Sequence, residues 1–117
     1  MDLTPEQWDQ VLEVIKSREI IPFMDIAYQG FSEDMAHDAY AIRKAVDMNL
    51  PVFVSNSFSK NLSLYDERFG GLSVLCPSED EAERVFGQLN FVIQRIYTSP
   101  PSHGGNIVDI VMHDDML

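Results

Sequence analysis

Lys60 and Arg68 are two residues of this chain whose types and spacing could do chemistry together. Lys60 lies in the segment Ser55-Asn56-Ser57-Phe58-Ser59-Lys60-Asn61, and Arg68 follows it by eight residues. A lysine amine can form a Schiff base with an aldehyde, while hydroxyls and a guanidinium suit a phosphate group. A lysine in a loop rich in serine and asparagine is ordinarily just solvated, so these residues alone do not establish a site.

Asp25 is a further candidate because it lies near the end of the apolar run Ile20-Ile21-Pro22-Phe23-Met24-Asp25-Ile26. An ionised carboxylate in such surroundings is costly unless a cation or a hydrogen-bond donor meets it. The simplest alternative is a carboxylate that caps a loop. Asp25 and Lys60 are 35 residues apart. This is the length of one αβ unit, a helix followed by a strand, which would place both residues at the same end of a sheet. Ligands bind at that end in open α/β folds.

The elements that must position these residues alternate along the chain. Thr4-Pro5-Glu6-Gln7 has the pattern of a capped helix start and predicts a helix that reaches about Lys16. A buried strand is expected over residues 20–26, a helix over 33–49, and a second buried strand over 52–55 that leads into the lysine segment.

A third strand is expected over residues 70–76, where Pro77 stops it. Ser78-Glu79-Asp80-Glu81 is another capping pattern, and apolar residues keep helical spacing from there to Ile96. A final short helix is predicted to begin near Asn106. This alternation predicts an α/β fold, and residues 1–117 contain no repeat or linker that would divide them into two domains.

The composition limits the classes of partner. The chain has 117 residues, 45% of them hydrophobic, and a net charge of −11 from 8 Lys+Arg and 19 Asp+Glu. Nucleic acid and anionic membranes would meet an unfavourable field, so neither is expected as a partner. No apolar stretch approaches the ~20 residues that span a bilayer.

The remaining chemistry-bearing residues predict little. Cys76 is the one cysteine and cannot form an intramolecular disulfide, so we interpret it as a buried, reduced thiol of a cytoplasmic protein. His37, His103 and His113 are dispersed without metal-ligand spacing, and no metal site is expected.

Two segments together resemble a known family. Pro22-Phe23-Met24-Asp25-Ile26-Ala27-Tyr28-Gln29-Gly30-Phe31 and the lysine segment with Arg68 are similar to two signature segments of the class I pyridoxal phosphate (PLP)-dependent aminotransferases, the aspartate and aromatic amino acid branch. The resemblance runs from Thr4 to Pro101, nearly the whole chain. It implies part of the three-layer α/β/α large domain of fold type I enzymes, with a mostly parallel sheet that is incomplete here. It also implies a homodimer for the full-length family.

The resemblance assigns roles around the cofactor ring. Lys60 would be the catalytic residue, forming a Schiff base with PLP and moving a proton between the substrate's α-carbon and the cofactor. Asp25 would pair with the protonated pyridine nitrogen, and Tyr28 would hydrogen-bond the phenolic oxygen. A fixed anion beside the ring nitrogen holds its proton and strengthens the electron sink.

The resemblance also assigns the phosphate contacts. Ser57, Ser59 and Arg68 match the family's phosphate-binding positions, where a planar guanidinium meets two phosphate oxygens. The alternative for Arg68 is an ion pair with Asp66 or Glu67 on a solvated loop. The alternative for the two serines is ordinary turn chemistry.

Some family features differ. The arginine that binds dicarboxylic substrates from the neighbouring subunit is replaced by Gln94, and Arg95, one residue on, would point about 100° away. Tyr97-Thr98-Ser99-Pro100-Pro101 is closer to the aromatic branch, which slightly favours aromatic over aspartate specificity.

Other parts of the family's site are missing. The chain resembles an internal segment and lacks the Asn-Pro-Thr-Gly turn, the glycine/serine phosphate loop, the aromatic residue that stacks on the cofactor and the arginine that binds the substrate α-carboxylate. We therefore expect a fragment of an aminotransferase that acts on aromatic or acidic amino acids and 2-oxo acids, inactive by itself. One alternative is a non-catalytic remnant or interaction module that retains part of the fold. Another is an unrelated α/β domain with chance matches.

Overall fold

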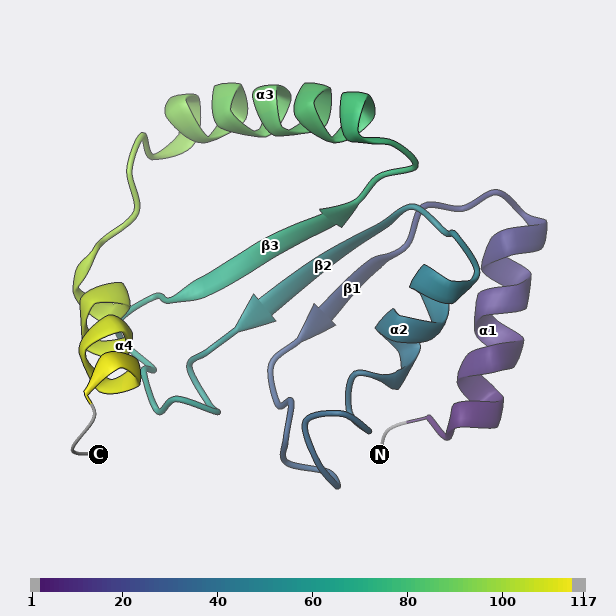
Figure 1. Ribbon diagram of the computed structural model, residues 1–117, viewed down its shortest axis with the longest axis horizontal. Coiled ribbons are helices and arrows are strands. Elements are labelled where there is room, and N and C mark those ends of the chain that lie inside the picture. The colour runs from purple at the N-terminus through teal and green to yellow at the C-terminus, as the bar shows by residue number, and fades with distance from the viewer. Residues whose placement is uncertain (1–2, 115–117) are drawn as a thin grey trace.

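The computed structural model describes residues 3–114 and is shown in Figure 1. Four helices and three strands follow one another in this part of the chain: α1 (Pro5–Ser17), β1 (Phe23–Ile26), α2 (Tyr40–Asp47), β2 (Val52–Ser57), β3 (Gly70–Leu75), α3 (Glu79–Ile96) and α4 (His103–His113). The α/β class expected from the alternation is confirmed.

The sheet has the order β1-β2-β3. β1 and β2 are parallel, with Phe23 opposite Phe53 and Asp25 opposite Ser55, whereas β2 and β3 are antiparallel. The arrows of β1 and β2 therefore point the same way in Figure 1 and that of β3 points back. The sheet of this chain is mixed, and the carboxyl ends of β1 and β2 lie at one edge.

The core lies between one face of the sheet and the helices α1 and α2. Leu12, Ala45 and Leu50 are buried together, and Met24 of β1 packs against them. Val52 and Val54 point to the same side and are buried, because side chains two residues apart on a strand share a face.

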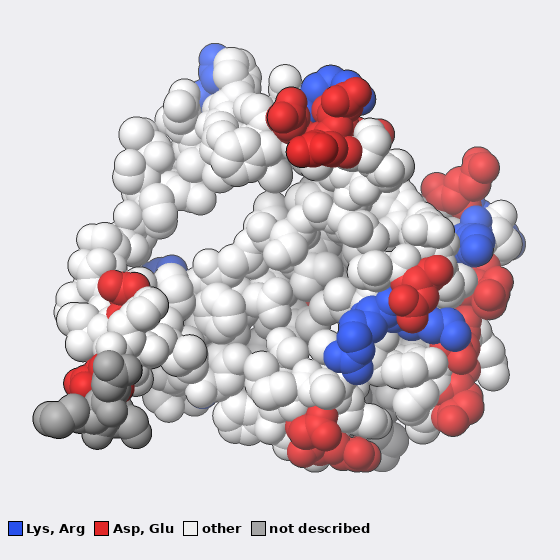
Figure 2. Space-filling model, in the orientation of Figure 1, with Lys and Arg blue, Asp and Glu red and all other residues white. Residues whose placement is uncertain are grey.

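The opposite face of the sheet is open. Phe23 stacks on Phe53 there, with ring centroids 5.9 Å apart, yet Phe23 is 64% exposed. α3 stands apart, since none of its residues is buried and Figure 2 shows open space between it and the rest of the molecule. Acidic side chains gather on its first turn, at Glu79, Asp80 and Glu81.

Both predicted helix starts with capping patterns are confirmed. The backbone N–H of Thr4 donates to Gln7 Oε1 at 2.9 Å and that of Gln7 donates to Thr4 Oγ1 at 3.3 Å. The N–H of Glu81 donates to Ser78 Oγ at 3.3 Å.

The helix expected over residues 33–49 is wrong in its first half, because α2 begins at Tyr40. Two carboxylates form turns there instead. Asp34 accepts the backbone N–H groups of residues 36 and 37, and Asp38 accepts those of residues 30, 32 and 33. Short acidic side chains that bind nearby N–H groups compete with the helix for its donors.

The other boundaries shift by a few residues. The strand expected from Ile20 begins at Phe23, after Pro22, and β2 continues to Ser57. α4 begins at His103 rather than near Asn106. No helix among residues 3–114 is both long and apolar enough to cross a membrane.

Candidate functional site

Asp25 and Ser55 meet on the open face of the sheet. They are register partners of the parallel pair β1 and β2, so their side chains point to the same side. The Ser55 hydroxyl donates a hydrogen bond to Oδ1 of Asp25 at 2.6 Å. Asp25 is exposed on this face, so its carboxylate can also receive a ligand.

Tyr28 and Lys60 meet just beyond the carboxyl ends of these two strands. The Lys60 Nζ lies 5.3 Å from the centroid of the Tyr28 ring. The face of an aromatic ring attracts an ammonium group at this distance. Two loops that are far apart in the sequence thus bring an amine and a phenol together at one edge of the sheet.

The serines of the lysine segment form its first turn. The backbone N–H of Ser59 donates to Ser57 Oγ at 3.4 Å, and Ser59 is 5% exposed. Phe58 and Phe69 close the loop, since their rings pack 5.3 Å apart and the N–H of Phe58 donates to the carbonyl of Phe69 at 3.1 Å. Ser57 accepts in this turn, and its hydroxyl proton remains available to a phosphate oxygen.

Arg68 lies on the returning side of this loop. It is exposed, its φ is 52°, and its Nη1 donates to the Tyr65 carbonyl at 3.3 Å. The ion pair with Asp66 or Glu67 that was the alternative for Arg68 is absent from residues 3–114. Glu67 Oε2 instead lies 2.6 Å from Nδ1 of His103 and joins the loop to α4.

The structure brings two pairs of the predicted residues together, Tyr28 with Lys60 and Ser57 with Ser59. Contacts within residues 3–114 join Tyr28 to Lys60, Ser57 to Ser59, and Asp25 to Ser55. The Arg68 side chain contacts its own loop. Ser55 is a partner of Asp25 that the residue types alone do not single out, because the register that places it there is a property of the fold.

These side chains fit PLP by the chemistry of their donor set. A carboxylate suits a pyridinium nitrogen, a phenol suits the ring oxygen, an amine suits the aldehyde, and hydroxyls with a guanidinium suit the phosphate. In residues 3–114 no cluster of three or more His, Cys, Asp or Glu side chains could hold a metal ion. Cys76 is a free, half-buried thiol.

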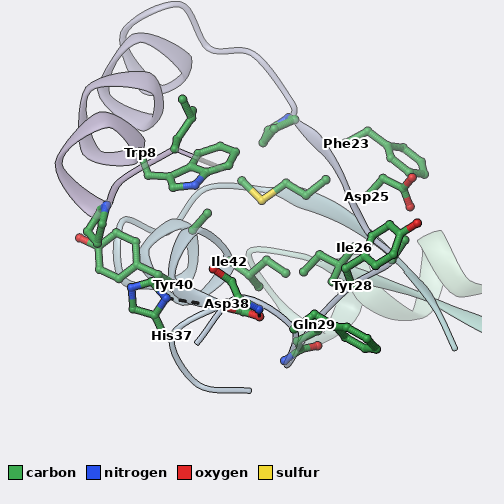
Figure 3. Close-up of a pocket in the computed structure, with 18 of the residues that line it drawn as sticks. Trp8, Phe23, Asp25, Ile26, Tyr28, Gln29, His37, Asp38, Tyr40 and Ile42 are labelled. Carbon is green, nitrogen blue, oxygen red and sulfur yellow. Dashed lines mark hydrogen bonds and ion pairs between the residues drawn. The ribbon is translucent and has the colours of Figure 1, made fainter. Parts of the chain in front are cut away.

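A cavity of about 670 Å³ lies beside this site, between α1, β1 and the segment before α2. Figure 3 shows Phe23, Asp25 and Tyr28 at one side of it and Trp8 and Tyr40 at the other. Lys60 and Arg68 do not line it. The cavity therefore shares Asp25 and Tyr28 with the candidate cofactor site, whereas the lysine and arginine of that site lie outside its lining.

Two groups in the wall of the cavity have shifted pKa values. The backbone N–H of Ser32, with those of Glu33 and Gly30, holds the pKa of Asp38 below its usual value despite some desolvation. The hydrogen bond from the Tyr40 hydroxyl to Asp9, 2.8 Å long, raises the pKa of Tyr40. Both interactions stabilise the start of α2. Asp38 binds the preceding loop, and Tyr40 binds α1.

Comparisons with known proteins all point to aminotransferases. A family model described as aminotransferase class I and II matches residues 1–117. The aromatic-amino-acid aminotransferase of Escherichia coli K12 is 55% identical over 116 residues, which are 99% of this chain and 29% of that protein.

Two solved structures give the same result in three dimensions. An aromatic amino acid aminotransferase from Psychrobacter sp. B6, cocrystallised with aspartic acid, has a TM-score of 0.93 and 77% identity over 99% of this chain and 29% of its own. An aromatic-amino-acid aminotransferase from Burkholderia pseudomallei, covalently bound to pyridoxal phosphate, has a TM-score of 0.93 and 54% identity over 97% of this chain and 29% of its own. The chain thus spans about 29% of the length of these relatives.

Proposed function

Because this chain belongs to the aminotransferase class I and II family, we propose that it is the lysine-bearing segment of a PLP-dependent transaminase. The reaction transfers an amino group from an aromatic or acidic amino acid to a 2-oxo acid. The observation that carries the proposal is the 5.3 Å approach of Lys60 Nζ to the Tyr28 ring at the carboxyl ends of β1 and β2.

Each residue has a role that its position supports. PLP, when bound, supplies an electron sink at the substrate's α-carbon. Lys60 would hold the cofactor covalently and move a proton, Asp25 would meet the ring nitrogen, and Tyr28 would donate to the phenolic oxygen. The hydroxyls of Ser57 and Ser59 and the guanidinium of Arg68 would bind the phosphate, and no carboxylate of residues 3–114 competes for Arg68 in an ion pair.

Substrate preference is proposed from the end of α3. Arg95 is engaged on its own helix, since its guanidinium lies 3.2 Å from the centroid of the Phe91 ring and donates to the Phe91 carbonyl at 3.3 Å. Its guanidinium thus already has partners on α3, and Gln94 carries no charge. An aromatic amino acid is the preferred amino donor, and the strongly similar aromatic aminotransferases support this choice.

The proposal extends to the complete protein. We expect it to be a cytoplasmic homodimer; the family resemblance supports the dimer, and the single free thiol Cys76 supports a reducing compartment. The fragment alone is expected to be inactive, because the groups that bind the substrate α-carboxylate belong to other segments of the family.

Borohydride trapping tests the function directly. The protein is incubated with PLP, reduced and digested, and the labelled peptide is identified by mass spectrometry. We expect the label on Lys60, with none in Lys60→Arg and full labelling in Lys44→Arg, whose ammonium pairs with Asp9 at 3.4 Å on the surface. A label spread over surface lysines would overturn the proposed site.

An activity assay separates the enzyme from a non-catalytic module. The full-length protein is mixed with tyrosine or aspartate and 2-oxoglutarate, and Lys60→Arg is the control. Turnover that depends on Lys60 supports a transaminase. Trapping at Lys60 without any turnover by the full-length protein would support the non-catalytic alternative.

A further inference from the structure

We propose that Ser55 is a positioning residue for the cofactor, acting through Asp25; this inference rests on the proposed function. The types and the order of the residues in the lysine segment do not assign a role to Ser55. Its place comes from the parallel register, in which Ser55 lies opposite Asp25. The 2.6 Å hydrogen bond from its hydroxyl to Asp25 Oδ1 carries the proposal.

The hydrogen bond fixes which carboxylate oxygen faces the ligand. A carboxylate on a single χ2 torsion rotates broadly unless a donor holds one of its oxygens. Ser55 holds Oδ1, so Oδ2 is the oxygen presented to a ring nitrogen. A hydroxyl that donates to an ionised carboxylate forms a short, strong hydrogen bond, as found here.

The strand register around this pair also aligns its neighbours on the same face. The preceding residues on the same face, Phe23 and Phe53, stack with an interplanar angle of 2°. A side chain held by sheet register and a hydrogen bond keeps the geometry that a cofactor contact requires. The Ser55 hydroxyl touches Asp25 and is not proposed to touch the reacting atoms.

A matched set of variants in the full-length protein tests this role. Ser55→Ala removes the hydroxyl, Ser55→Thr retains it, and Ser73→Ala removes a hydroxyl from β3 on the other face of the sheet, opposite Val54. The measurements are the PLP dissociation constant, the pH midpoint of the bound cofactor's visible absorption band, and the midpoint of thermal unfolding without PLP.

Ser55→Ala is expected to weaken PLP binding about tenfold, the size of one hydrogen bond to a charged group, and to shift the pH midpoint. Ser55→Thr is expected to restore both within about twofold, and Ser73→Ala to change neither. In an Asp25→Ala background, Ser55→Ala is expected to change binding by less than about twofold, because the two residues act as one unit.

Each other outcome has a defined meaning. Normal PLP binding at Lys60 by both the parent protein and Ser55→Ala would overturn the role of Ser55 and leave the proposed function standing. An equal loss of binding with and without Asp25 would also overturn it. Failure of the parent protein to bind PLP at Lys60 would overturn both proposals.

Discussion

The ammonium of Lys60 lies 5.3 Å from the centre of the Tyr28 ring, although the two residues come from loops after different strands. The contact exists because β1 and β2 are parallel and end at the same edge of the sheet. It places an amine beside a phenol at the edge where the two strands end.

The ring and the hydroxyl of Tyr28 can be tested separately. Tyr28→Phe keeps the ring under Lys60 and loses the phenol, and we expect PLP binding to weaken about fivefold, as for one neutral hydrogen bond. Tyr28→Ala loses the ring as well and is expected to weaken binding a further two- to fivefold. The PLP dissociation constants give the result, and equal values for the two variants would show that the ring contact contributes nothing.

Arg68 is expected to provide the strongest phosphate contact. Arg68→Ala should weaken PLP binding about 10- to 100-fold, because hydrogen bonds to a charged group are lost. The PLP affinity of Arg68→Lys should lie between those of the parent protein and Arg68→Ala, since an ammonium keeps the charge but lacks the planar guanidinium geometry. Arg84→Ala, an exposed arginine of α3, is the control. Equal effects of Arg68→Ala and Arg84→Ala on PLP affinity would remove Arg68 from the site.

Gly70 and Gly71 form a matched pair beside Ser57. A Cβ on Gly70 would lie 2.5 Å from the backbone carbonyl oxygen of Asn56, whereas a Cβ on Gly71 would meet nothing within 4 Å. Gly70→Ala should therefore lower the free energy of unfolding by about 1–3 kcal/mol. Gly71→Ala should change it by about 0.5 kcal/mol or less. Chemical denaturation measures both, and similar stabilities would contradict the close approach of β2 and β3.

Asp38 should make stability depend on pH. Its pKa is lowered in the folded chain by the N–H of Ser32 and its neighbours. A lowered folded pKa contributes stability that is present above the ordinary pKa of about 3.8 and is lost as pH falls through the folded value. Asp38→Asn should lower the thermal midpoint at pH 7, and the difference from the parent should shrink below about pH 4.

The control for this prediction is Asp66→Asn, an exposed carboxylate in the loop before Arg68. It should leave the thermal midpoint nearly unchanged at both pH values. A difference between Asp38→Asn and the parent that grew on acidification would reverse the assigned sign.

Gln94 should control the response to acidic substrates. In the full-length protein, Gln94→Arg should lower the KM for aspartate about tenfold, because a charge-assisted hydrogen bond to the side-chain carboxylate is gained. The KM for tyrosine should change much less. Gln88→Arg, six residues earlier on α3, adds the same charge elsewhere on the helix. If both variants lowered the KM for aspartate equally, general electrostatic attraction would explain the result.

The sequence by itself determined the α/β alternation, the starts of two helices and the candidate residues. Capping patterns at Thr4 and Ser78 marked the starts of α1 and α3, because these helix ends depend on hydrogen bonds within four residues. Asp25, Lys60 and Arg68 were identified from their types and order, which resemble signature segments of a family.

The tertiary structure decided which of these residues touch. The pairing of Ser55 with Asp25 follows from the register of two strands, and that of Tyr28 with Lys60 from the edge where the strands end. Asp38 falls within the helix that the sequence predicts over residues 33–49, yet its carboxylate accepts N–H groups five to eight residues earlier and ends the loop before α2. Local sequence cannot fix such contacts, because they depend on the distance and direction between segments that only folding brings together.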